Sequence, residues 1–351
     1  MKSSKIDVAF GIMDIDGLYY LNIMTVCSEI FSHANTKVHL HILHDETLSA
    51  AHIEEFRNFV ISNEHEISFY DVSKDRKLDQ AGKISMCRGM LYRLCMFDYC
   101  LNVDKMIYLD CDVLVTGDIS KLWNFDISNY YIGVVKDMPY TRDVYINNAY
   151  YRKMGLSPEL YFNSGVLLIN LSKIREDFDV LSELEKFATK YPHCAMLDQD
   201  FLNCVFKNKV LYLSEMYNFM PENVENLTEK DIEANVIIHF AGPFKPWNCR
   251  NPIVIEYFCR NFANIFEKEK QQEYIIKYMS KLPKRHFERL GLRHALLQYD
   301  KSTLKENKFI ITCTCFLKGI LPDKVFRRLA YDFMIKFKIK ILYSFYYCVP
   351  L

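Results

Sequence analysis

Short apolar runs alternate with helix-like segments along the first third of the chain, and this alternation constrains the fold more than any other feature. Residues 7–12, 37–43 and 67–70 resemble strands, whereas residues 19–31 and 48–60 repeat apolar side chains at helical spacing. Strands that alternate with helices are typical of an α/β fold with a mostly parallel sheet. Polar side chains that directly follow such strands are site candidates, because ligands bind beyond the carboxyl ends of parallel strands.

The stretch YLDCDVLV places two carboxylates inside an apolar run. Residues 106–109 are predicted to form a buried strand, with Asp110 and Asp112 at its carboxyl end. Residues i and i+2 of an extended chain face the same side, so both carboxylates can address one cation while Cys111 points away. Isolated buried carboxylates are costly, and their hard oxygens suit Mg²⁺ or Mn²⁺. The stretch therefore predicts a divalent-cation site.

The stretch NVIIHFAGPFKPW has the same arrangement of an apolar strand followed by functional side chains. His239 ends the predicted strand 236–238 and is a candidate for a third metal ligand. Gly242 and Lys245 follow in a compact loop, where a lysine suits a phosphate clamp.

The stretch MLDQDFLN is predicted to open a helix, because apolar side chains recur at helical spacing through residues 201–206. Asp198 is the expected N-cap, with Gln199 and Asp200 in the first turn. The positive end of this helix favours carboxylates and phosphates.

Two further stretches supply candidate site residues. In YFNSGVLLINL, a polar turn containing Asn163 and Ser164 leads into a buried strand, and Gly165 permits close approach of another group. Arg93 lies in an otherwise apolar helix-like stretch, which indicates contact with a charged ligand or a buried partner rather than with solvent.

Composition excludes several classes of protein. Lysine plus arginine equals aspartate plus glutamate at 44 each, which gives no reason to expect a nucleic-acid partner. The first residues, MKSSKIDVAFGIMD, lack the apolar core of a secretion signal, and no run reaches the ~18 apolar residues of a membrane span. Twelve cysteines without a CxxC pair give little support to zinc-ribbon or redox chemistry. The expected location is the cytoplasm.

The four stretches YLDCDVLV, YFNSGVLLINL, LDQDFLN and HFAGPFKPW, in this order, resemble the retaining glycosyltransferases of family 8. The resemblance implies a GT-A fold, a Rossmann-like nucleotide-sugar-binding domain with a mostly parallel sheet, over residues 1–250. It implies a UDP-hexose donor and a saccharide or glycolipid acceptor such as lipopolysaccharide.

The resemblance also implies roles for individual residues. Asp110, Asp112 and His239 would hold Mn²⁺, or Mg²⁺, on the donor diphosphate. Lys245, the Gly242 backbone and Cys111 would line the nucleotide site, while Arg93, Asn163 and Asp198 would position the sugar. Asp14 and Asp16, in a segment where the family reads close to DDNY and this chain reads MDIDGLYY, are the candidates for uracil and ribose contacts. Gln199 would lie beside the anomeric carbon, and Asp200 is the carboxylate available for a covalent intermediate; the sequence does not choose between these two routes to retention.

Two other functions fit part of the pattern. A strand followed by DxDVLV also opens haloacid-dehalogenase-type phosphatases, although there the motif begins the domain, whereas more than a hundred residues precede Asp110 here. A nucleotide-sugar-binding protein without catalysis is the second alternative, because of the altered N-terminal segment.

Residues 251–351 are expected to form a helical extension. From residue 318 to residue 340 seven basic residues stand against two acidic ones, and an aromatic stretch, ILYSFYYCVPL, follows. Basic residues beside aromatic ones suit an anionic membrane interface, so residues 318–351 are predicted to contact the inner face of the cell membrane peripherally. The alternative is a packed terminal element.

Overall fold

The computed structural model describes residues 5–84, 87–146, 149–194, 196–247, 249 and 251–265. These residues belong to one compact unit, which spans Met1–Gln271. The residues predicted to contact a membrane, 318–351, and most of the predicted C-terminal extension lie outside the described residues. No helix in the described ranges is long and apolar enough to cross a membrane.

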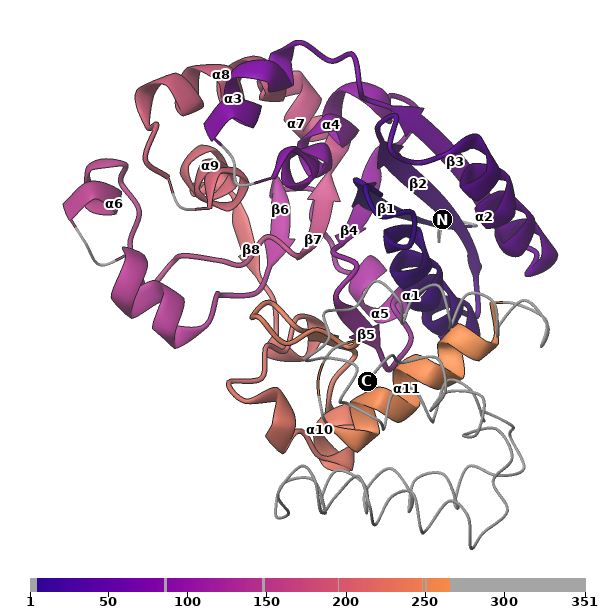
Figure 1. Cartoon of the computed structure of the whole chain (residues 1–351). Helices are drawn as coiled ribbons and strands as arrows, with labels where there is room; N and C mark the ends of the chain where they lie inside the picture. The colour runs from indigo at the N-terminus through magenta and orange to yellow at the C-terminus, as the bar shows by residue number, and fades with distance from the viewer. Residues whose placement is uncertain are drawn as a thin grey trace, which may run out of the picture. The chain divides into compact units, whose positions relative to one another are not determined.

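A seven-stranded sheet, in the order β3-β2-β1-β4-β7-β6-β8, forms the centre of this unit (Figure 1). Four of its six strand pairs are parallel, and β7 runs antiparallel to both of its neighbours. The predicted α/β architecture with a mostly parallel sheet is therefore confirmed. Its strands are β1 (Lys5–Ile12), β2 (Lys37–His44), β3 (Glu66–Asp71), β4 (Lys105–Leu109), β6 (Ile132–Val134), β7 (Val166–Asn170) and β8 (Val210–Tyr212).

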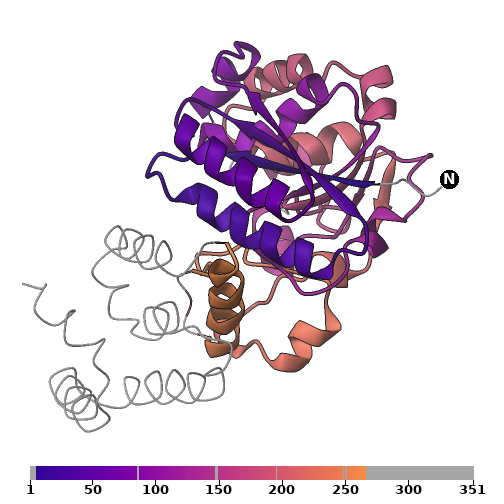
Figure 2. The same cartoon turned by 90° about the vertical axis from the view of Figure 1, so that its right-hand side faces the viewer.

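Helices cover both faces of the sheet (Figures 1 and 2). On one face lie α1 and α2, where Phe56 of α2 packs edge-on against Phe69 of β3. On the other face α4 contacts β1 and β2, and it shares a buried core with residues of α8 and α9. The longer helices are α1 (Tyr19–His33), α2 (Ala50–Ser62), α3 (Lys77–Ile84), α4 (Tyr92–Tyr99), α7 (Leu171–Asp177), α8 (Val180–Lys190), α9 (Leu197–Phe206) and α11 (Pro252–Ala263), and the shorter ones are α5 (Ser120–Trp123), α6 (Ala149–Lys153) and α10 (Glu229–Ala234).

A second, two-stranded antiparallel sheet pairs β5 (Val113–Val115) with β9 (Ile237–His239). Its register sets Val113 opposite His239, and the backbone N–H of Phe240 donates to the Asp112 carbonyl at 2.9 Å. This pairing therefore brings two stretches that are more than a hundred residues apart to the same place.

The antiparallel direction of β7 explains why the polar turn at residues 163–165 precedes its strand, whereas the other polar groups follow theirs. Because β7 runs against β4, its amino end lies beside the carboxyl end of β4, with Val166 opposite Leu109. The Asp110 N–H accordingly donates to the Gly165 carbonyl at 2.8 Å.

The start of α9 differs from the expectation. The helix begins at Leu197, its N-cap residue is Met196, and no side chain caps it. Asp198, the expected N-cap, lies inside the first turn instead, because its carboxylate pairs with the Arg93 guanidinium.

Candidate functional site

Three side chains predicted as metal ligands meet where β4 and β9 end and β5 begins. The Nε2 atom of His239 lies 3.4 Å from Asp112 Oδ1 and 3.9 Å from Asp110 Oδ2. One potential ligand atom from each residue lies within 4.8 Å of the others. His239 is buried, whereas the two carboxylates are partly accessible. Two carboxylates and one imidazole suit a divalent ion such as Mn²⁺.

The imidazole of His239 is held by a chain of amide side chains. Its Nδ1 lies 3.0 Å from Asn218 Oδ1, and Asn218 Nδ2 donates to Asn163 Oδ1 at 3.0 Å. Because Nδ1 then carries the proton, the lone pair of Nε2 faces the two carboxylates. Asn218 was not predicted from the sequence, since it stands in an irregular segment with no motif around it.

Gly165 makes room for this group of ligands. A Cβ atom on Gly165 would lie 2.2 Å from Cε1 of His239 and 2.8 Å from Oδ2 of Asp110. Only glycine therefore leaves both side chains in place. The space and the donor set together fit a bound divalent cation.

Contacts with two neighbouring side chains keep the Asp112 carboxylate ionised. Burial alone would raise the pKa of Asp112, but His239 and Lys245 outweigh it and hold the pKa well below its usual range. The Lys245 ammonium donates to Asp112 Oδ2 and, at 2.8 Å, to the Phe240 carbonyl.

Arg93 joins the cation-binding group to the first turn of α9. Its guanidinium donates to Asp110 Oδ1 and to Asp198 Oδ2, each at 2.9 Å, and to the Ser164 carbonyl at 2.7 Å. Burial would lower the pKa of Arg93, but Asp110, Tyr108 and Asp198 outweigh it, so the guanidinium stays charged. Of the two expectations for Arg93, a charged ligand or a buried partner, the structure shows a buried partner, Asp198.

Asp198 keeps one unused acceptor. It is 1% exposed, and its Oδ1 atom has no hydrogen-bond partner within the described part of the chain. Burial raises the pKa of Asp198 although Arg93 opposes this effect. A buried acceptor without a partner costs about 1–3 kcal/mol, which indicates that a ligand supplies the missing donor.

Gln199 is fixed by hydrogen bonds at both ends of its amide. Its Oε1 accepts from the Ser164 N–H at 2.9 Å, and its Nε2 donates to Asp137 Oδ2 at 2.7 Å and to the Tyr161 hydroxyl at 3.1 Å. Asp137 and Tyr161 were not predicted as site residues. The sequence around each of them has no pattern of polar residues that would distinguish Asp137 from a capping residue or Tyr161 from a core residue.

A cavity of about 400 Å³ collects these groups. Polar side chains from six separate stretches line it, together with a few small or apolar residues. The lining consists of Gly11, Met13, Tyr19, Cys87, Gly89, Met90, Arg93, Tyr108, Asp110, Cys111, Asp112, Asn163, Ser164, Gly165, Met196, Asp198, Gln199, His239, Ala241 and Lys245.

Four predicted site residues are not part of this lining. Asp14 is buried and accepts the Tyr19 N–H at 2.6 Å at the start of α1, and Asp16 accepts the Leu18 N–H at 3.1 Å. Asp200 is buried behind the cavity, where its Oδ1 accepts from the Tyr161 hydroxyl at 2.6 Å. Gly242 lies in the loop between the lining residues Ala241 and Lys245, and a Cβ atom added to it would meet open space.

The sheet order and the direction of its strands define a GT-A glycosyltransferase fold. The solved galactosyltransferase LgtC, in complex with donor and acceptor sugar analogues, matches with a TM-score of 0.64 at 24% identity, over 77% of this chain and all of that chain (100%). GlyE of Streptococcus pneumoniae matches with a TM-score of 0.54 at 19% identity, over 74% of this chain and 62% of that one.

The sequence model of glycosyl transferase family 8 matches residues 12–250, and the chain belongs to this family. A lipopolysaccharide 1,2-glucosyltransferase of Escherichia coli K12 is 25% identical over 70% of this chain and 74% of its own length. A Haemophilus influenzae protein that carries the name glycosyltransferase is 35% identical over 44% of this chain. The chain spans about half of that relative's length, 48%.

Proposed function

We propose that this chain transfers a hexose, galactose or glucose, from a UDP-sugar to a saccharide or glycolipid acceptor with retention of the anomeric configuration. The observation that carries the proposal is the meeting of Asp110, Asp112 and His239 with Lys245 in one cavity. Membership of family 8 supports the same activity and gives the phosphatase alternative no support.

Asp110, Asp112 and His239 are the proposed ligands of Mn²⁺ or Mg²⁺. When bound there, such an ion would neutralise charge on the donor diphosphate and on the departing UDP. Lys245 would add a fixed positive charge on the same side of the cavity, which favours the state in which UDP carries the negative charge. The Gly242 backbone and Cys111 are proposed to line the same diphosphate region.

The sugar is proposed to bind against Asp198. The buried Oδ1 atom of Asp198 needs a hydrogen-bond donor, and a hexose hydroxyl supplies one. Arg93 fixes the Asp198 carboxylate, and Asn163, which is buried beside Gln199, presents an amide to the same region. For the uracil and ribose we propose the part of the cavity lined by Met13 and Gly89. The Asp14 and Asp16 carboxylates are engaged instead by backbone N–H groups at the start of α1.

The position of Gln199 supports a one-step route to retention. Gln199 lines the cavity, whereas Asp200 lies outside the lining and is engaged by Tyr161. Burial raises the pKa of Asp200 to about 7, which reduces the ionised fraction that a nucleophile needs. We therefore propose that Gln199 shields one face of the sugar while acceptor and departing UDP share the other.

Release of UDP from UDP-galactose and UDP-glucose, with and without Mn²⁺, tests the proposed function. We expect turnover that requires a divalent ion and that falls at least about 100-fold in Asp110→Asn, since one charge-stabilising group is lost. The proposal fails if no nucleotide sugar is turned over. Calorimetric binding of UDP without turnover would favour the non-catalytic binding protein instead.

We further propose a lipid-linked acceptor at the cytoplasmic face of the cell membrane, because residues 318–340 are strongly basic and an aromatic stretch follows. The full chain should sediment with vesicles that contain anionic lipid, and a chain that ends at residue 317 should not. Equal sedimentation of the two chains would contradict membrane contact through this segment.

A further inference from the structure

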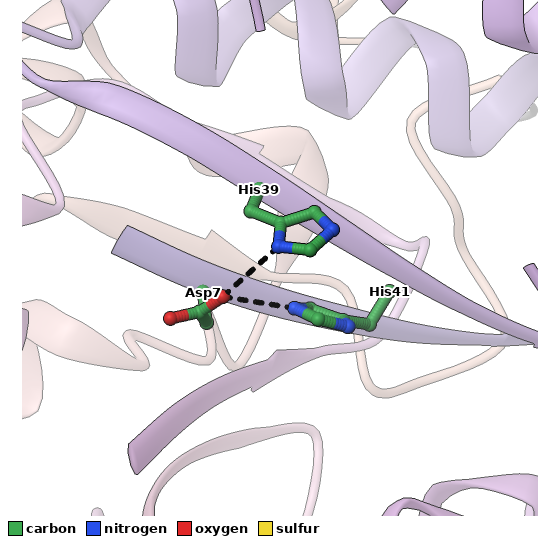
Figure 3. A group of neighbouring side chains, drawn as sticks. All are labelled: Asp7, His39 and His41. Atoms are coloured by element: carbon green, nitrogen blue, oxygen red, sulfur yellow. Dashed lines mark hydrogen bonds and ion pairs between the residues drawn. The ribbon is translucent and has the colours of Figure 1, made fainter. Parts of the chain in front are cut away.

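A second group of potential metal ligands lies on the sheet itself, away from the cavity. Asp7 on β1 and His39 and His41 on β2 point to the same face of the sheet (Figure 3). The register pairs Asp7 with His39 and Ala9 with His41, so alternate residues of two parallel strands converge. His39 Nδ1 lies 3.3 Å and His41 Nε2 lies 2.9 Å from the same atom, Asp7 Oδ1.

This group is separate from the proposed catalytic site. Gly11, near the other end of β1, lines the cavity, and Asp7 stands four residues earlier on the same strand. At a rise of about 3.3 Å per residue, the two positions are roughly 13 Å apart. An ion held at Asp7 therefore cannot contact a ligand in the cavity.

The outer nitrogen of each imidazole has an oxygen partner. His39 Nε2 lies 2.9 Å from the Ser68 hydroxyl, and His41 Nδ1 lies 3.0 Å from the Tyr70 hydroxyl. Metal-binding histidines in proteins usually have such a partner, which holds the proton on the outer nitrogen and turns the lone pair of the inner nitrogen toward the metal. Both inner nitrogens here face the Asp7 carboxylate.

The group already attracts a positive charge from a neighbouring side chain. Lys5 supplies one, with its Nζ atom 3.1 Å from His39 Nδ1 and 3.2 Å from Glu66 Oε2.

The separations fit zinc coordination. A tetrahedral zinc ion with ligands at about 2.0–2.1 Å sets neighbouring ligand atoms roughly 3.3 Å apart, close to the 3.3 Å and 2.9 Å seen around Asp7 Oδ1. Imidazoles select Zn²⁺ over Mg²⁺ or Ca²⁺. The side chains of His39 and Asp7 are 16% and 12% exposed, which leaves a side open to an ion and a water ligand.

We propose that Asp7, His39 and His41 form a Zn²⁺ site that links β1 to β2, with water as the fourth ligand. Zinc takes the place of the Lys5 ammonium beside His39 Nδ1. Because an ion that binds only the folded chain stabilises it, zinc raises the melting temperature.

Zinc binding to the full chain with Asp110→Asn and Asp112→Asn tests the proposal, since these changes disable the ligands in the cavity. We expect one zinc per chain by elemental analysis after dialysis, and a rise in melting temperature on adding zinc. A further His39→Ala change should weaken zinc binding by more than the ~10- to 100-fold that loss of an outer partner causes. Uptake that His39→Ala leaves unchanged, or no stoichiometric uptake by the parent, would overturn the proposal.

Three controls separate this site from other zinc ligands. The matched variant His33→Ala, at the end of α1, should keep the zinc and its thermal effect. Cobalt substituted for zinc should give no thiolate-to-metal charge-transfer band; such a band would assign the uptake to cysteine and overturn the proposal. Lys5→Met should bind zinc more tightly because the competing ammonium is gone, and weaker binding would count against the site.

Discussion

The guanidinium of Arg93 donates to the carboxylate of Asp198 at 2.9 Å although the two residues are more than a hundred positions apart. The same guanidinium reaches Asp110 at 2.9 Å. One buried cation therefore fixes the distance between the carboxylate proposed to bind sugar and the carboxylate proposed to bind metal. Neither a surface pair nor a lysine has this geometry, because only the planar guanidinium presents several donors in fixed directions.

Arg93→Lys should separate geometry from charge. Lysine keeps the positive charge but cannot donate to Asp110, Asp198 and Ser164 at once. The loss of a hydrogen bond to a charged group amounts to about 1.5–3 kcal/mol. We expect kcat/KM for the UDP-sugar to fall about 10- to 100-fold, measured by steady-state kinetics. Arg57→Lys, on the exposed side of α2, should leave it unchanged; an equal loss in both variants would contradict the argument.

The pKa of Asp200 predicts a pH-dependent stability. Burial raises this pKa to about 7 from an ordinary value of 3.8. The contribution of Asp200 to the free energy of unfolding is therefore complete below about pH 4 and is lost as the pH rises toward 7. In this range Asp200 is ionised in the unfolded chain but still protonated in the folded chain. The total is of the order of 4 kcal/mol.

Urea unfolding of the wild type and of Asp200→Asn, at pH 5 and at pH 8, measures this effect. The asparagine cannot ionise, so its stability relative to the wild type should rise between the two pH values. Asp104→Asn, whose side chain is 87% exposed, is the control and should show no such trend. A difference between wild type and Asp200→Asn that does not change with pH would contradict the raised pKa.

Gly165→Ala should disturb the proposed metal ligands directly. Its Cβ would overlap His239 and approach Asp110, so at least one of them must move. We expect the Mn²⁺ concentration for half-maximal turnover to rise at least about 10-fold. Gly117→Ala is the matched control, because its Cβ would meet Val236 at 3.6 Å, an ordinary contact. A normal Mn²⁺ requirement in Gly165→Ala would show that neither side chain is a ligand.

Local patterns in the sequence carried much of the fold. The predicted strands at residues 7–12 and 106–109 and the predicted helix at residues 19–31 agree with β1, β4 and α1 to within a few residues. Their residues are buried almost continuously, which gives the apolar runs that a sequence window can detect. The antiparallel insertion of β7 between β4 and β6 depends on pairing across distant segments, and no local pattern encodes it.

Some site residues could likewise be predicted from local sequence patterns, whereas others depend on contacts between distant segments. Asp110 directly follows β4, Asp112 directly precedes β5 and His239 ends β9. Such positions beside apolar strands are recognisable in the sequence, and the structure brings the three side chains together. Asn218 and Asp137 lie in irregular segments and hydrogen-bond to His239 and Gln199, respectively. No sequence pattern around them distinguishes them from other polar loop residues. The N-cap expected at Asp198 was wrong because pairing with the buried Arg93 competes with capping, and helix-start statistics do not include that partner.

The contacts of the buried Glu29 side chain, which lies on α1, indicate that α11 contributes to the stability of the sheet domain. Its Oε1 accepts from Asn261 Nδ2 of α11 at 3.1 Å, and its Oε2 accepts from the Val115 N–H of β5 at 2.6 Å. Burial raises the pKa of Glu29, although both hydrogen bonds oppose it. Glu29→Ala would leave the Val115 N–H buried without an acceptor, so we expect a loss of about 2–4 kcal/mol in the free energy of unfolding. Glu29→Gln keeps an acceptor for Val115 and should recover at least half of that loss in urea unfolding. A Glu29→Ala chain as stable as the wild type would show that the contact between α1, β5 and α11 does not support the fold.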